Sequence, residues 1–133
     1  MFKVRIVLAA ALTLAALSPA IAETSARWSM GGNTREFAQY VELADASGKL
    51  FRITGHCQSA CTMFLAVRNV CVEPSAELLF HAGQHPEGTA RMLNAYNGRL
   101  RAYLMAHHAM ETRQFHTISG HDIIHKFGYR ACP

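Results

Sequence analysis

The feature that most constrains this chain is a short polar turn, residues 55–62, between two apolar segments. Residues 50–54 (Leu-Phe-Arg-Ile-Thr) have the pattern of a β-strand, and the apolar residues 60–67 predict a buried helix. The turn carries Ser59 at the start of that helix, where free backbone N–H groups favour a developing negative charge. Such a position suits acyl-transfer chemistry, although a serine there is also a common helix cap.

The N-terminal segment, residues 1–22, has the composition of a secretory signal peptide. It has a basic start, an apolar run over residues 6–17 and a final Ala-Ile-Ala that resembles a cleavage site. The apolar run is too short to span a bilayer comfortably. We therefore expect a mature chain that begins at Glu23, forms one domain over residues 23–133, is periplasmic or secreted, and has no stable membrane anchor. A retained N-terminal anchor is the alternative.

Charge in the predicted mature chain is nearly balanced. Residues 23–133 contain eleven lysines and arginines against nine acidic residues, and the arginines are scattered along the sequence. Nucleic-acid binding needs a basic patch or stripe, which this distribution does not predict.

All four cysteines lie in the predicted mature chain, so we expect two disulfides: Cys57, Cys61, Cys71 and Cys132. Cys57 and Cys61 are four residues apart across the turn and the helix start, so a bridge between them is expected to be awkward. We favour the pairs Cys61–Cys71 and Cys57–Cys132 over the crossed alternative. A redox-active pair at Cys57 and Cys61 is a competing interpretation, although the spacing differs from thioredoxin-like Cys-x-x-Cys sites.

The remaining pattern alternates strands and helices, which predicts an α/β domain with a small parallel or mixed sheet and crossover helices. Strands are predicted over residues 26–30, 50–54, 70–72 and 77–81, and helices over 34–43, 60–67, 89–108 and 119–128.

Three chemically suggestive features follow predicted strands. They are the pair Gly31-Gly32, then Ser59, then His81. The carboxyl ends of parallel strands meet on one side of a sheet, where ligands bind. The order therefore predicts backbone donors for an oxyanion, a nucleophile and a base at one site.

With these features the chain resembles the superfamily of the Clp protease proteolytic subunit and crotonase, particularly small exported members with a Gly-x-Cys-x-Ser-Ala-Cys-Thr turn. The matching elements are Gly31-Gly32, Gly55-x-x-x-Ser59, Phe80-His81 and Phe127-Gly128, and they cover most of residues 23–133. The resemblance implies a truncated crotonase-like, Clp protease-like fold. The chain is much shorter than the protease subunit, so the oligomeric ring and chaperone docking of that family are not implied, and oligomerisation stays open.

For individual residues, the resemblance implies that Ser59 is the nucleophile and His81 its base. The backbone N–H of Ala60, with that of Gly31 or Gly32, would form the oxyanion hole. The implied reaction is hydrolysis of a peptide, or of another amide or ester, through an acyl-enzyme and without a cofactor.

The orienting acid of the triad has no clear counterpart. In the peptidase family its position corresponds to residues 115–116, and neither Phe115 nor His116 is acidic. Asp122 is the best substitute, although its ordinary role would be an acid at a helix start. The alternatives to a hydrolase are a catalytically inactive module that binds a peptide or an envelope protein, and a small disulfide-rich structural protein without a site.

Eight histidines raise the question of a metal site. His121 and His125 are one helical turn apart, but no established zinc-binding signature accompanies them, so no metal is expected. Arg68 and Arg91 could bind the carboxylate of a substrate, or could be solvated arginines at helix ends.

Overall fold

The computed structural model describes residues 23–133, and the predicted signal peptide lies outside this part of the chain. Within residues 23–133, six short strands form two sheets of three strands. In the first sheet β1 (Glu23–Thr24), β2 (Phe51–Ile53) and β4 (Val70–Val72) are parallel, in the order β1-β2-β4. In the second, β5 (Glu77–Phe80) pairs in parallel with β3 (His56–Gln58) and antiparallel with β6 (His116–Ser119). The predicted mixed α/β class is thereby confirmed.

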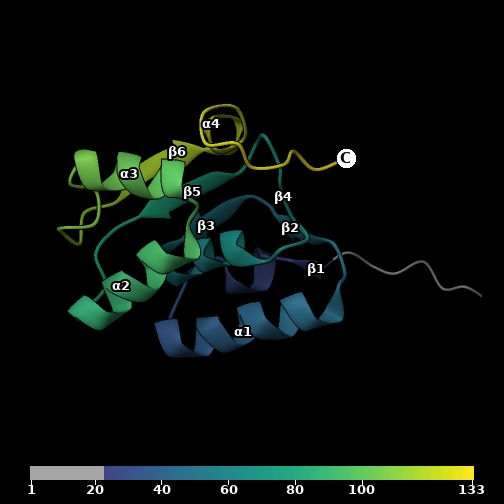
Figure 1. Cartoon of the computed structure of the whole chain (residues 1–133), viewed down its shortest axis with the longest axis horizontal. Helices are drawn as coiled ribbons and strands as arrows, with labels where there is room; N and C mark the ends of the chain where they lie inside the picture. Colours follow the sequence, from purple (N-terminus) through teal and green to yellow (C-terminus); the bar gives the residue numbers. More distant parts are fainter. Residues whose placement is uncertain (1–22) are drawn as a thin grey trace, which may run out of the picture.

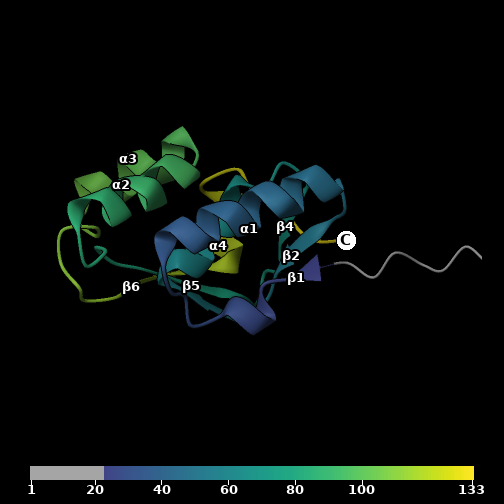
Figure 2. The ribbon, with the colours of Figure 1, turned by 90° about the horizontal axis from the view of Figure 1, so that it is seen from below.

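In the described part of the chain, four α-helices and two 3-10 helices pack around the strands. The α-helices are α1 (Thr34–Ser47), α2 (Pro86–Ala95), α3 (Gly98–Ala106) and α4 (Gly120–His125), and the 3-10 helices are η1 (Ala26–Trp28) and η2 (Ser59–Ala66). Figure 1 shows α1 along one side of the strands, with α4 and β6 on the opposite side. Seen from below in Figure 2, α1 crosses the strands, while α2 and α3 lie together at one end of the molecule.

The prediction of a single helix over residues 89–108 is wrong, because this segment contains two helices, α2 and α3. The backbone of Tyr96 is extended, and the side chain of Asn97 accepts a hydrogen bond from the N–H of Leu100, 3.0 Å away, which caps the new helix α3. Both helices bury apolar side chains in the core, Met92 from α2 and Leu100 and Leu104 from α3. The pattern therefore continues across a break that periodicity alone does not reveal.

The N-terminal and central segments also differ from the prediction. Residues 26–30 are not a strand but the helix η1 and the turn after it, closed by a hydrogen bond from the N–H of Gly31 to the carbonyl of Trp28. The buried segment after Ser59 is a 3-10 helix rather than an α-helix. Strands β1, β3 and β6 were not predicted; β3 lies inside the segment 55–62 that the sequence indicated to be a turn.

The core is built around η2, whose residues from Ala60 to Leu65 are all buried. The ring of Phe64 stacks on that of Phe51 with centroids 4.3 Å apart, and it also contacts Trp28 and Phe37. This cluster joins the first sheet to η1 and α1. The apolar segment after the turn thus anchors the turn to the rest of the molecule, which gives Ser59 a fixed position.

Both disulfides are formed, but the predicted pairing is wrong. Cys57 is bonded to Cys61, and Cys71 to Cys132. A bridge between residues four apart is accommodated because Ser59 reverses the chain, which brings the Cα atoms of Cys57 and Cys61 to 5.3 Å. Disulfides are typical of oxidising compartments, consistent with an exported protein. Within residues 23–133, no helix has the length and hydrophobicity needed to cross a membrane.

Candidate active site

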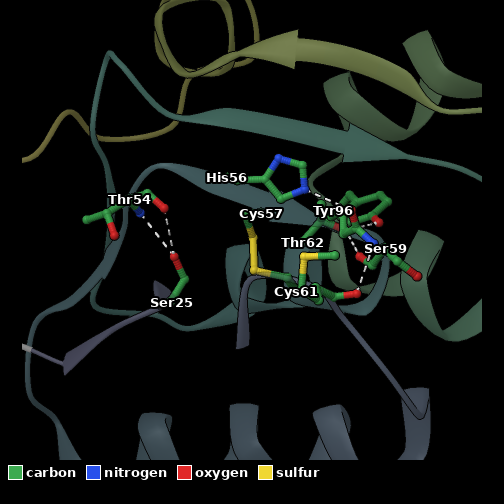
Figure 3. The surroundings of a disulfide bond; sticks show 10 residues. Ser25, Thr54, His56, Cys57, Ser59, Cys61, Thr62 and Tyr96 are labelled. Carbon is green, nitrogen blue, oxygen red and sulfur yellow. Dashed lines mark hydrogen bonds between the residues drawn. A yellow bond between two sulfur atoms is a disulfide. The ribbon is translucent and has the colours of Figure 1, made fainter. Parts of the chain in front are cut away.

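Ser59 lies in a sharp turn between β3 and η2. Its φ angle is +55°, a left-handed conformation that non-glycine residues seldom adopt. Strain of this kind persists only where the surrounding structure imposes it, and it is common at functional sites. Figure 3 shows the Cys57–Cys61 disulfide spanning the turn that carries Ser59.

Buried hydrogen bonds hold the turn from within. The hydroxyl of Thr62 lies 2.6 Å from the carbonyl oxygen of Ser59 and 2.6 Å from the phenol oxygen of Tyr96 (Figure 3). Burial raises the pKa of Tyr96, so its phenol stays neutral and remains able to donate. Tyr96 lies at the break between α2 and α3, and the interruption of the predicted helix therefore supports the serine turn.

The backbone of Gly31 packs directly against the same turn. A methyl group at its α-carbon would lie 2.8 Å from the carbonyl oxygen of Gln58, 2.9 Å from the Cβ of Ser59 and 3.1 Å from the nitrogen of Ala60. The side-chain amide of Gln58 also donates to the carbonyl of Met30, 3.1 Å away. Only glycine fits this approach, and the predicted Gly-Gly element does lie beside the predicted nucleophile.

The two glycines differ in what their N–H groups can do. The N–H of Gly31 donates to the carbonyl of Trp28 at 3.0 Å and is therefore occupied. The N–H groups of Gly32 and Ala60 have no backbone or side-chain acceptor within residues 23–133. Of these two residues of the predicted oxyanion hole, Gly32 lines the cavity described below, whereas Ala60 is fully buried and is not among the lining residues; Gly31 supports the turn.

His81 follows the end of β5 and is 5% exposed. Its Nδ1 is buried without a hydrogen-bond partner, which leaves Nε2 as the ring nitrogen able to meet a ligand. The rings of His81 and Phe115 pack edge to face, with their centroids 4.9 Å apart. Burial, and secondarily the charge of Arg113, lower the pKa of His81, so the imidazole is neutral near pH 7.

Ser59 and His81 line the same cavity, of about 710 Å³. Gly32 and the first turn of α1 form one part of its wall, and the loop over residues 83–85 with the first turns of α2 forms another. Arg113 and Phe115, from the segment before β6, complete it. The volume is that of a site for a small ligand or a short peptide.

Asp122 is not brought to this cavity. Its carboxylate accepts from Lys126 at 2.8 Å, and its N–H donates to the hydroxyl of Ser119, which caps α4. The hydrogen bond from Lys126 is the main cause of the lowered pKa of Asp122. Ser119, at the start of α4, pairs with Glu77, which lies at the opposite end of β5 from His81. Roughly 13 Å of strand separates Glu77 from His81. Asp122 has the ordinary role of an acid in the first turn of a helix.

His121, His125 and Arg68 do not line the cavity. The rings of His121 and His125 are 4.3 Å apart on α4, and within residues 23–133 no three His, Cys, Asp or Glu side chains form a group able to hold a metal. Arg68 pairs with Asp45 at 3.0 Å, whereas Arg91 lines the cavity.

The sequence interpretation missed Arg113 and the contact of Phe115 with His81. The only available signal for Phe115 was its spacing before Phe127-Gly128, which placed it near the expected position of the acid. No match to this chain is found among protein-family models, curated proteins or solved structures.

Proposed function

We propose that this protein is an exported serine hydrolase of the peptidase-like kind, with Ser59 as nucleophile and His81 as base. The observation that carries the proposal is the shared cavity: a serine in a strained turn, a buried histidine and Gly32, whose N–H is a candidate oxyanion donor, line one space. A truncated crotonase-like fold, a periplasmic or secreted location and action without a cofactor are parts of the same proposal.

In the proposed mechanism, His81 Nε2 takes the proton of Ser59 Oγ as that oxygen attacks the carbonyl carbon of an amide or ester. The N–H groups of Gly32 and Ala60 stabilise the oxyanion of the tetrahedral intermediate. His81 then returns the proton to the leaving nitrogen or oxygen, and an acyl-enzyme remains. Water attacks the acyl-enzyme by the same route, which releases the acid and restores Ser59.

The missing acid sets the expected rate. Loss of the orienting carboxylate costs a serine protease about 10⁴ in turnover, because the imidazole is no longer held in its productive tautomer and orientation. Nδ1 of His81 likewise has no hydrogen-bond partner to hold the imidazole in one tautomer and orientation. We therefore expect a slow hydrolase.

The absence of a partner for Nδ1 of His81 also supports a second candidate function. A module that only binds a peptide or an envelope protein in the cavity needs no orienting acid, and the aromatic contact of Phe115 with His81 is compatible with that use. In that case Ser59 serves only to shape the turn.

Labelling with a fluorophosphonate probe separates the two functions. The oxidised protein is compared with Ser59→Ala, His81→Ala and the control Ser75→Ala, which alters an exposed serine that does not line the cavity. We expect labelling of the parent and of the control, and none of the other two. A folded parent with both disulfides formed and no labelling would reject the hydrolase in favour of the binding module.

A further inference from the structure

The cavity concentrates the positive charge of the protein. Three arginines (Arg35, Arg91 and Arg113) and one acid (Glu87) line it. Of the eleven lysines and arginines and nine acids in residues 23–133, this leaves eight of each elsewhere. The excess of basic over acidic residues is therefore located entirely at the cavity.

These three arginines have no acidic partner within the described part of the chain. Arg52 and Arg68, by contrast, form ion pairs with Glu73 and Asp45. At the cavity, Arg91 makes one side-chain hydrogen bond, from Nη1 to the hydroxyl of Thr34 at 3.3 Å. Glu87 forms no ion pair with any of the three arginines. Within the described residues, three arginines thus line the cavity without an ion pair.

The ends of two helices add to this field. Helices α1 and α2 both begin at the cavity wall, and the backbone N–H groups of a helix N-terminus carry partial positive charge. Within the same space, His81 is buried and its Nδ1 lacks a partner. The arginines and the helix N-termini together favour an anionic ligand beside Ser59.

We propose that the cavity selects substrates that carry a carboxylate close to the scissile carbonyl, and that Arg91 and Arg113 bind this carboxylate. A guanidinium matches a carboxylate with two parallel N–H···O hydrogen bonds, which gives orientation as well as attraction. Thr34 positions Arg91, and Arg113 lies beside the base. The carboxylate can come from the end of a peptide chain or from an acidic side chain. The role as a substrate rests on the proposed hydrolase function, whereas the binding itself does not.

Binding is measured by calorimetry on the full-length, oxidised Ser59→Ala protein, so that hydrolysis is not required. The probes are benzoyl-Gly-Gly and its C-terminal amide, which differ only in the carboxylate. We expect the acid to bind about tenfold more tightly than the amide, and Arg91→Gln and Arg113→Gln each to reduce that preference severalfold. Arg99→Gln, which removes the same charge outside the cavity, should leave the preference unchanged.

Equal binding of the acid and the amide, or no binding of either, would overturn the proposal. So would an equal loss in Arg99→Gln, which would indicate a general charge effect, or tighter binding of inorganic phosphate than of the acid. Benzoyl-Gly-Asp with an amidated C-terminus tests the side-chain source, and preference for either carboxylate supports the proposal. Retained binding in a protein that the fluorophosphonate does not label would reject the hydrolase alone, and labelling without selective binding would reject this inference alone.

Discussion

The ring of Phe115 packs against the ring of His81 at an interplanar angle of 76°, with centroids 4.9 Å apart. In a serine hydrolase the histidine is usually oriented by a carboxylate that accepts from Nδ1. Here Nδ1 is buried without an acceptor, and an aromatic ring packs against the imidazole. The first prediction follows from this contact.

Phe115→Glu should restore an acceptor for His81. A glutamate carboxylate extends about as far from the backbone as the centre of a phenylalanine ring, and Phe115 is 43% exposed, so the new charge stays partly hydrated. We expect a higher pKa for His81 and about tenfold faster fluorophosphonate labelling. Phe115→Gln has nearly the same shape without the charge and should show neither change. Equal labelling rates in the two variants would contradict the orienting role.

Gly31→Ala should destabilise the protein and abolish labelling. The added methyl group would lie 2.8 Å from the carbonyl oxygen of Gln58, at a φ angle of +73°. Gly48→Ala is the matched control, because Gly48 has a φ angle of +65° with nothing within 4 Å of the added methyl. We expect a loss of about 1 kcal/mol in the unfolding free energy of the control from backbone strain, and a further 1–3 kcal/mol or so in Gly31→Ala from the clash. Urea denaturation measures both, and equal losses would show that the close approach is absent.

The two disulfides should differ in what they contribute. The Cys71–Cys132 bond closes a loop with a sequence separation of 61, against four for Cys57–Cys61. Replacing both cysteines of the Cys71–Cys132 pair by alanine should then lower the unfolding free energy by about 4 kcal/mol through chain entropy. The same change at Cys57–Cys61 should lower it by about 2 kcal/mol.

Removal of the Cys57–Cys61 bond should affect fluorophosphonate labelling more than removal of Cys71–Cys132, the reverse of the order for stability. The Cys57–Cys61 bond spans the turn of Ser59, so its removal should slow fluorophosphonate labelling about tenfold or more, because small displacements of a nucleophile are costly. The Cys71–Cys132 variant should be labelled at the parent rate at temperatures where it is folded. Parent-like labelling in the Cys57–Cys61 variant would show that the bond does not shape the site.

The pH dependence of labelling reports on His81. Burial and then Arg113 lower its pKa below the ordinary value of about 6.5, so the neutral base persists into mildly acidic solution. The acid limb of the labelling rate should therefore have its midpoint below 6.5, and Arg113→Gln should move it upward while Arg99→Gln does not. A midpoint unchanged in Arg113→Gln would show that Arg113 does not act on the base.

Stability should follow the same titration. The unfolded chain binds a proton at His81 more readily than the folded chain, so the unfolding free energy should fall as pH decreases through about 6.5 toward the lower, folded pKa. His81→Gln should flatten this part of the stability curve relative to the parent, as measured by urea denaturation at several pH values.

Several features could be predicted from the sequence because they depend on short segments. The apolar runs on either side of residues 55–62 indicate a strand and a buried helix, and they place Ser59 between them. The alternation of elements indicates the α/β class, and the position of His81 after an apolar run indicates the end of a strand. In each case a few consecutive residues determine burial and backbone preference, and these patterns survive in the folded protein.

Other features were decided only by the tertiary structure. The partner of each cysteine depends on how the chain turns at Ser59 and on the pairing of the C-terminal segment with β4, where the N–H of Cys132 donates to the carbonyl of Val72. The register of β5 with β6 carries Asp122 away from His81 and, at the other end of the strands, allows Phe115 to contact it. Arg91, on α2, and Arg113, before β6, are 22 residues apart in sequence but line one cavity. Contacts of this kind depend on the free energy of packing whole segments against one another, which local patterns of hydrophobicity do not contain.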